Sequence, residues 1–269
     1  MSAPLTIIPH VEPPPLALTP GPLHFSTLKK MARSPAHVHH AMTSSANDAT
    51  RDMRIGTIVH HMVCGPHNRR PLLRFDGDTR RGVAWETFKR NAPPLAEIVT
   101  VPEWAEAEPI AAAVLADPVA TEIIGQSRRE VALRWDNAGI ACETDGIDGV
   151  NDAARSIWDL KITHDSSPAG FSRLAARMHY HAQMSWMQDG ANANGIPTDG
   201  GVFLIATEAT PPYPVTVIVC GPEVLERGGM LVTLWLERYR GCRDSGVWPG
   251  YAQRPVPFEL PEWASDDDE

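Results

Sequence analysis

The chain has 269 residues, which suffices for one large domain or two small ones with a buried core. No apolar run approaches the ~20 residues of a membrane-spanning helix, and the N-terminal residues lack the basic and apolar regions of a secretory signal. Four scattered cysteines without a CxxC pair favour a reducing, cytoplasmic setting. The net charge of -9 disfavours a nucleic-acid partner, but residues 51–90 hold nine Lys and Arg against four Asp and Glu, either as a solvated face or as a binding surface.

The first part of the chain is predicted to be helical. Residues 1–22 are proline-rich and predict an extended, poorly ordered arm, and residues 23–269 predict a single domain because no repeat or linker divides them. Helices are expected at 26–34, at about 46–63 and from Pro102 to just before Pro118, with an Arg-rich loop at 65–82.

The second part alternates strands with helices. Three strands are predicted to form a meander, followed by a long helix, two further strands and a last helix. In chain order these elements are expected at 130–135, 140–150, 156–163, 168–189, 202–208, 214–220 and 222–239. The pattern predicts an α/β or α+β domain with one central sheet and helices around it.

Acidic residues gather on the three predicted strands of the meander. Asp159 and Lys161 are two residues apart on one strand, so their side chains leave the same face of the sheet. Asp148 ends the neighbouring strand, and Glu130 begins the strand before it. Converging carboxylates favour a divalent cation, and oxygen ligands suit Mg²⁺ or Mn²⁺ better than Zn²⁺. A D-x-K tripeptide alone is common, and it is most often a solvated ion pair.

The helix that follows has two faces. One face is largely apolar, from Phe171 to Trp186. The other face carries two cations, a phenol and an amide, namely Arg173, Arg177, Tyr180 and Gln183. These groups suit phosphate oxygens, although an exposed polar helix face is the alternative.

The order of these motifs resembles the RecE-type (exodeoxyribonuclease VIII) recombination nucleases and, more distantly, the lambda-type exonucleases. The core of the resemblance is IWDLKITHDSSPAGFSRLAARMHYHAQMSWMQDG, with its Y-x-x-Q motif at Tyr180 and Gln183. The family's G-T-x-x-H helix is matched by MRIGTIVHHMV, which contains His60. Its acidic residue before the first catalytic motif is matched by Glu130 in REVALRW. The two ends of that nuclease domain are matched by LKKMARSPAHVHHA and WPGYAQRPVPFELPEWA. The sequence departs from the family at Ile147, where proline is usual, and at Ile162, which precedes Thr163.

The resemblance implies a restriction-endonuclease-like PD-(D/E)xK fold and a bacterial or phage-encoded enzyme. Asp148 and Asp159 would hold Mg²⁺, or Mn²⁺ in its place, assisted by Glu130, His60 and the backbone carbonyl of Leu160. Lys161 would orient the attacking water, with Tyr180 and Gln183 in support. The implied activity is 5′-to-3′ degradation of linear double-stranded DNA, leaving 3′ tails for a single-strand annealing protein, by subunits assembled in a homo-oligomeric ring.

Two other interpretations remain open. One is a repair or CRISPR-associated PD-(D/E)xK nuclease, although Cys220 and Cys242 do not supply the clustered cysteines of an iron–sulfur site. The other is a catalytically inactive DNA-binding module, which would have no use for acids facing phosphate. If the chain does bind DNA, Arg51 and Arg54 of the basic segment are expected to line the path together with Arg173 and Arg177.

Overall fold

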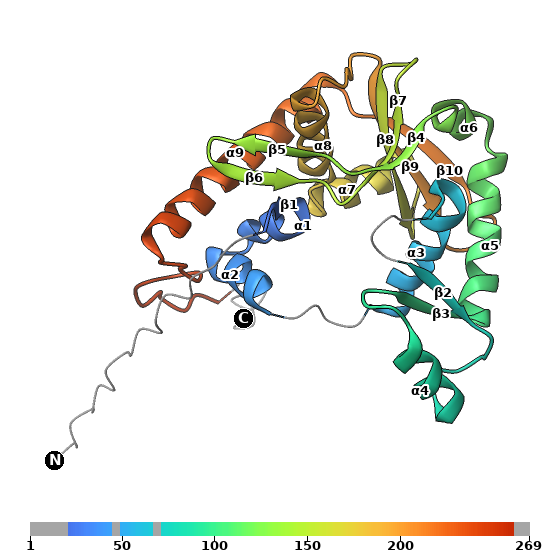
Figure 1. Cartoon of the computed structure of the whole chain (residues 1–269). Helices are drawn as coiled ribbons and strands as arrows, with labels where there is room; N and C mark the ends of the chain where they lie inside the picture. Colours follow the sequence, from blue (N-terminus) through green and yellow to red (C-terminus); the bar gives the residue numbers. More distant parts are fainter. Residues whose placement is uncertain (1–20, 45–48, 67–70, 261–269) are drawn as a thin grey trace, which may run out of the picture.

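The computed structural model describes residues 21–44, 49–66 and 71–260 (Figure 1). The expected proline-rich arm at 1–22 therefore lies almost entirely outside the described residues. Among the helices in the described ranges, none is both long and apolar enough to cross a membrane.

A five-stranded mixed sheet forms the centre of the molecule, as the sequence predicts. Its strands lie in the order β10-β9-β8-β7-β4, and only β8 and β9 are parallel. Their bounds are Arg128–Val131 for β4, Ile147–Asn151 for β7, Ser156–Thr163 for β8, Gly201–Glu208 for β9 and Val215–Val219 for β10.

Helices cover both faces of this sheet (Figure 1). Trp158 and Leu160 of β8 pack with α3, α5 and α6, whereas Ile157 packs on the opposite face with α7 and α8. This alternation is the two-residue period of a strand that is buried on both sides. The helices span Arg51–Cys64 (α3), Val101–Ala116 (α5), Pro118–Ile124 (α6), Pro168–Arg177 (α7), Tyr180–Ala193 (α8) and Pro222–Ser245 (α9), and α9 packs against α8.

Two smaller sheets flank the centre. In one, β1 pairs with β6 in parallel and β6 pairs with β5; in the other, β2 and β3 are parallel neighbours. Their bounds are Leu23–His24 (β1), Leu72–Phe75 (β2), Glu97–Thr100 (β3), Arg134–Asn137 (β5) and Ile140–Glu143 (β6). The remaining helices are Phe25–Leu28 (α1), Lys29–Ala32 (η1, a 3-10 helix), Pro35–Thr43 (α2) and Gly82–Asn91 (α4).

Several predicted elements differ from the structure. The expected strand 130–135 is divided between Val131 and Arg134, and β4 and β5 enter different sheets. The expected strand 140–150 divides likewise into β6 and β7. The predicted meander order is kept in the central sheet as the antiparallel neighbours β4, β7 and β8, but β5 and β6 leave it for a smaller sheet. The long helix breaks where His179, with a φ of 59°, turns the chain between α7 and α8. The expected loop at 65–82 contains β2.

Candidate active site

A pocket of about 500 Å³ opens at the ends of β7 and β8. Its walls come from α3 and α8, and also from β1 and α1 at the start of the described chain. Six of the residues that the sequence singled out line this pocket: His60, Glu130, Asp148, Asp159, Lys161 and Gln183. The structure therefore brings together residues as far apart in the sequence as His60 and Gln183, which are separated by 123 positions.

Asp159 and Lys161 point toward α8 from the same face of β8. The Lys161 ammonium forms an ion pair with the Asp159 carboxylate and stands 4.7 Å from the ring centroid of Tyr180. Gln183 donates from Nε2 to Asp159 Oδ1 at 3.4 Å. The first turn of α8 thus fixes the Asp–Lys pair from the side, because Tyr180 and Gln183 lie three residues apart on one helical face.

The Asp148 carboxylate accepts a backbone hydrogen bond from β8 just beyond the point where the regular pairing of β7 and β8 ends. The paired register of β7 and β8 begins at Gly149 and Trp158, and beyond it the Leu160 N–H donates to Asp148 Oδ2 at 2.6 Å. Gly149 permits this approach, since a Cβ there would lie 2.1 Å from the Trp158 ring. His60 of α3 places its Nδ1 3.3 Å from the same Asp148 oxygen.

Glu130 reaches the pocket from β4. Its left-handed backbone turns the side chain toward Gly146, where an added Cβ would lie only 2.6 Å from Glu130 Oε2. Burial, followed by the nearby negative charge of Asp148, raises the pKa of Glu130 to about 7. An elevated pKa of this kind is typical of carboxylates held together without a cation between them.

Burial and neighbouring charges shift the pKa values of the buried groups in the pocket in different directions. Burial raises the pKa of Asp159 above its usual range, and Lys161 only partly offsets this effect. Burial would also raise the pKa of Asp148, but His60 and the Leu160 N–H outweigh it and lower that pKa. The pKa values of His60 and Lys161 rise, because the two aspartates outweigh the effect of burial on each base.

The donor groups of the pocket fit a divalent cation. His60, Cys64, Glu130 and Asp148 each offer a ligand atom, and these atoms all lie within 4.8 Å of one another. Asp159, only 3% exposed, adds a further carboxylate beside them. Carboxylates that are buried this closely repel one another unless a cation neutralises them.

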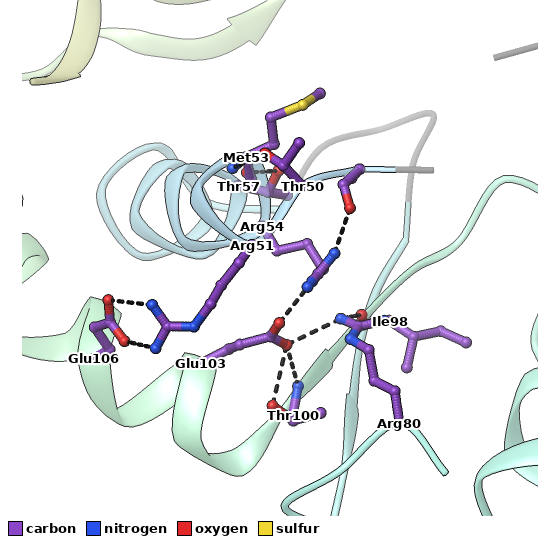
Figure 2. Close-up of polar contacts among 11 residues, drawn as sticks. Thr50, Arg51, Met53, Arg54, Thr57, Arg80, Ile98, Thr100, Glu103 and Glu106 are labelled. Atoms are coloured by element: carbon purple, nitrogen blue, oxygen red, sulfur yellow. Dashed lines mark hydrogen bonds and ion pairs between the residues drawn. The ribbon is translucent and has the colours of Figure 1, made fainter. Parts of the chain in front are cut away.

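The predicted DNA-binding arginines lie outside the pocket lining. Arg51 forms an ion pair with Glu106, and Arg54 donates from Nε to Glu103 Oε1 at 2.6 Å (Figure 2). Both therefore connect α3 to α5. Arg173 and Arg177 are exposed on α7, and within the described part of the chain neither has a carboxylate at ion-pair distance.

Sequence reasoning missed two residues of the site. Cys64 follows His60 by four positions on α3, so a search for helical His-x-x-x-Cys spacing would have found it. Lys29 lines the pocket from η1, and burial, followed by the ammonium groups of Lys161 and Lys30, lowers its pKa. No spacing signal marks Lys29, because it approaches Lys161 only through the tertiary fold.

Comparisons with known proteins agree with this architecture. The sequence profile of a family described as "PDDEXK-like domain of unknown function (DUF3799)" matches residues 24–255. No curated protein matches the chain. A crystal structure of a candidate exonuclease from Eubacterium rectale superposes with a TM-score of 0.62 at 13% sequence identity, over 92% of this chain and 94% of that chain. At this identity the likeness shows a shared fold. Because the family profile spans most of the sequence, the chain belongs to the DUF3799 family of PDDEXK-like domains.

Proposed function

We propose that this protein is a metal-dependent deoxyribonuclease that hydrolyses phosphodiester bonds. The observation that carries the proposal is the buried Asp159–Lys161 pair on β8, which faces the pocket beside Asp148. These residues lie where the pairing of β7 and β8 ends. The two carboxylates can bind a cation and the ammonium can bind a phosphate, and phosphodiester hydrolysis needs both groups in one place. Membership of a PDDEXK-like family supports the same reaction.

Each residue has a role that follows from its contacts. A divalent cation, which we propose to be Mg²⁺, would be held by Asp148 and Asp159 with Glu130, His60 and the Leu160 carbonyl, where it would polarise the phosphate and acidify a water molecule. Lys161 keeps its charge, because the aspartates raise its pKa, and it can therefore orient that water or stabilise the phosphorane.

Tyr180 and Gln183 hold this arrangement without binding the metal. The Tyr180 ring lies against the Lys161 ammonium, and Gln183 restrains the Asp159 carboxylate. Lys29 brings a second ammonium to the pocket lining, so that two cations could contact a phosphate group.

The finer proposal is a 5′-to-3′ exonuclease on linear double-stranded DNA that produces 3′ tails for recombination. The resemblance to RecE-type nucleases supports this polarity, a ring-shaped homo-oligomer and an annealing partner. The pocket walls formed by β1 and α1 are consistent with a site that receives a strand end, since His24, Phe25 and Ser26 add to the lining beside the acids.

Digestion of end-labelled duplex tests both levels of the proposal. Linear DNA labelled at either end, with and without a 5′-phosphate, is incubated with Mg²⁺ or with EDTA beside a covalently closed circle. We expect loss of the 5′ label first, no reaction in EDTA and no attack on the circle. Undiminished cleavage in EDTA would overturn the metal-dependent mechanism, and equal cleavage of the circle would overturn the exonuclease assignment alone.

A further inference from the structure

One helix carries both a nitrogen and a sulfur ligand toward the acidic pocket. His60 and Cys64 are four residues apart on α3, so their side chains lie on the same helical face. His60 and Gly65 line the pocket, and Cys64 lies between them, 3% exposed. The Cys64 thiol is close enough to Asp148 and Glu130 to experience their charge.

The spacing of the four donor atoms suits a small tetrahedral cation. In a tetrahedral zinc site with bonds of 2.0–2.3 Å, neighbouring ligand atoms lie about 3.3–3.8 Å apart. The His60 Nδ1 to Asp148 Oδ2 distance is already 3.3 Å, and all four atoms lie within 4.8 Å of one another. Movements of about 1 Å by the Cys64 and Glu130 side chains would therefore close the shell.

The other cysteines have different surroundings. Cys142 lies in the apolar cluster beneath α9, and Cys220 lies in the cluster beneath α8. In the described ranges, Cys64 is the cysteine that joins a group of potential metal ligands. Cys64 also borders the apolar cluster of α3, α5 and α6, but it differs from Cys142 and Cys220 because its Sγ lies within 4.8 Å of ligand atoms of His60, Glu130 and Asp148.

We propose that His60, Cys64, Glu130 and Asp148 form a binding site for a borderline-soft divalent cation of the Zn²⁺ class. Binding forms a metal–sulfur bond at Cys64 Sγ and releases the thiol proton to solvent. Sulfur and imidazole ligands favour Zn²⁺ over Mg²⁺, which prefers oxygen and six ligands. The site shares Asp148, Glu130 and His60 with the catalytic centre proposed above, so the two cations exclude one another.

The number of protein ligands decides whether such a cation supports cleavage or inhibits it. Four protein ligands complete a tetrahedral shell and leave no open position for water, as in structural zinc sites. Zn²⁺ therefore inhibits cleavage that Mg²⁺ supports. This consequence rests on the proposed nuclease function, whereas the binding site itself does not.

Cobalt spectroscopy tests the site without reference to cleavage. Co²⁺ replaces Zn²⁺ in such sites, and a thiolate ligand gives a charge-transfer band in the near ultraviolet. We expect this band when Co²⁺ is added to the full chain, and we expect Zn²⁺ to abolish it. Cys64→Ser should remove the band and weaken Zn²⁺ binding by at least about tenfold. Cys142→Ser, a buried cysteine outside the ligand group, should leave both unchanged.

Each result has a defined meaning. A band that persists in Cys64→Ser, or that never forms in the parent protein, overturns the proposal. If Cys64→Ser does not fold, calorimetric titration of Zn²⁺ into the parent protein and into His60→Gln replaces it, and equal affinities overturn the site. A thiolate band together with no cleavage of any DNA in Mg²⁺ would leave the site standing and overturn the nuclease function instead.

Discussion

Asp159 is buried and paired with Lys161, and its burial raises its pKa. Because burial raises its pKa, the folded protein binds the Asp159 proton more tightly than the unfolded chain does. Asp159→Asn keeps the shape and removes the charge. We expect cleavage to fall by at least about 10³-fold, while the free energy of unfolding in metal-free buffer stays within about 1 kcal/mol or rises.

The measurement for Asp159→Asn pairs single-turnover cleavage with thermal unfolding. Circular dichroism reports the fold of the same samples. A variant that melts much earlier than the parent, and that loses activity only in proportion to its unfolded fraction, would show that Asp159 has a structural role instead.

Tyr180 and Gln183 should matter less than Asp159. Tyr180→Phe keeps the ring that faces the Lys161 ammonium, and Gln183→Ala removes one long hydrogen bond. We expect each to reduce the cleavage rate by about tenfold or less. Gln188 lies farther along α8, and its side-chain amide donates to the Thr198 hydroxyl. Gln188→Ala is therefore the matched control and should have no effect on the rate. Complete loss in Tyr180→Phe or Gln183→Ala would place that residue in direct contact with the reacting groups.

At the scale of the elements, Glu103 ties α3, α5 and the β2–α4 connection together (Figure 2). Its carboxylate accepts from the Thr100 N–H at 2.8 Å, from Arg54 and from Arg80 at 2.9 Å. Burial alone would raise the pKa of Glu103, but these donors outweigh it and lower the pKa to about 2. The stabilisation is therefore fully present above the ordinary value of about 4.5 and is lost as the pH falls toward 2.

Glu103→Gln should reveal this dependence on pH. We expect it to lower the free energy of unfolding by about 2–3 kcal/mol at pH 7 and by progressively less below pH 4. Urea unfolding at both pH values measures the difference. Glu106→Gln, which removes a more exposed partner of Arg51, is the control and should cost less than about 1 kcal/mol. A Glu103→Gln penalty that does not change with pH would show that packing, not charge, accounts for its effect.

The sequence predicts some of these elements and misses others for a physical reason. The bounds of β8 follow from local alternation, and those of α5 follow approximately from Pro102 and Pro118, which are local signals. The break between α7 and α8 at His179 has no such signal, since non-glycine residues adopt positive φ only where tertiary contacts impose it.

Of the residues in the candidate site, some could likewise be predicted from the sequence and others could not. Asp148, Asp159 and Lys161 were found because strand period and motif order act locally along the chain. Cys64 and Lys29 reach the same pocket from helices whose orientation depends on distant packing. The count of charged residues in segment 51–90 predicted a basic surface, but it could not show which arginines form ion pairs within the fold, as Arg54 does, and which remain exposed.

At the scale of the whole molecule, the proposed DNA binding by a chain with a net charge of -9 requires a local basic surface. Arg51 and Arg54 are engaged by Glu106 and Glu103, so Arg173 and Arg177 on α7 are the better candidates. The double variant Arg173→Gln/Arg177→Gln should reduce the salt slope of duplex binding by about 1–2, since each neutralised phosphate contributes about 0.9. Binding is measured in Ca²⁺, in place of Mg²⁺, across a salt series.

The control for α7 removes the same charge elsewhere. Arg128 and Arg155 are exposed arginines paired with Asp152 and Asp199, and Arg128→Gln/Arg155→Gln should leave the salt slope near that of the parent. An equal change in both double variants would mean that net charge, and not the α7 surface, governs binding. No change in either would place the DNA path on other residues.

The parallel pairing of β1 with β6 also governs when the pocket can form. Leu23 pairs with Cys142 and His24 with Glu143, so this wall joins parts of the chain that are 119 positions apart in the sequence. Contacts so distant in sequence form slowly, because the loop entropy is lost before the contact stabilises the fold. The helical segment after β1 packs in turn against α9, which follows every strand of the described chain. A growing chain thus carries its acids and Lys161 before α9 exists, and it can complete the packing behind this pocket wall only after α9 has been made.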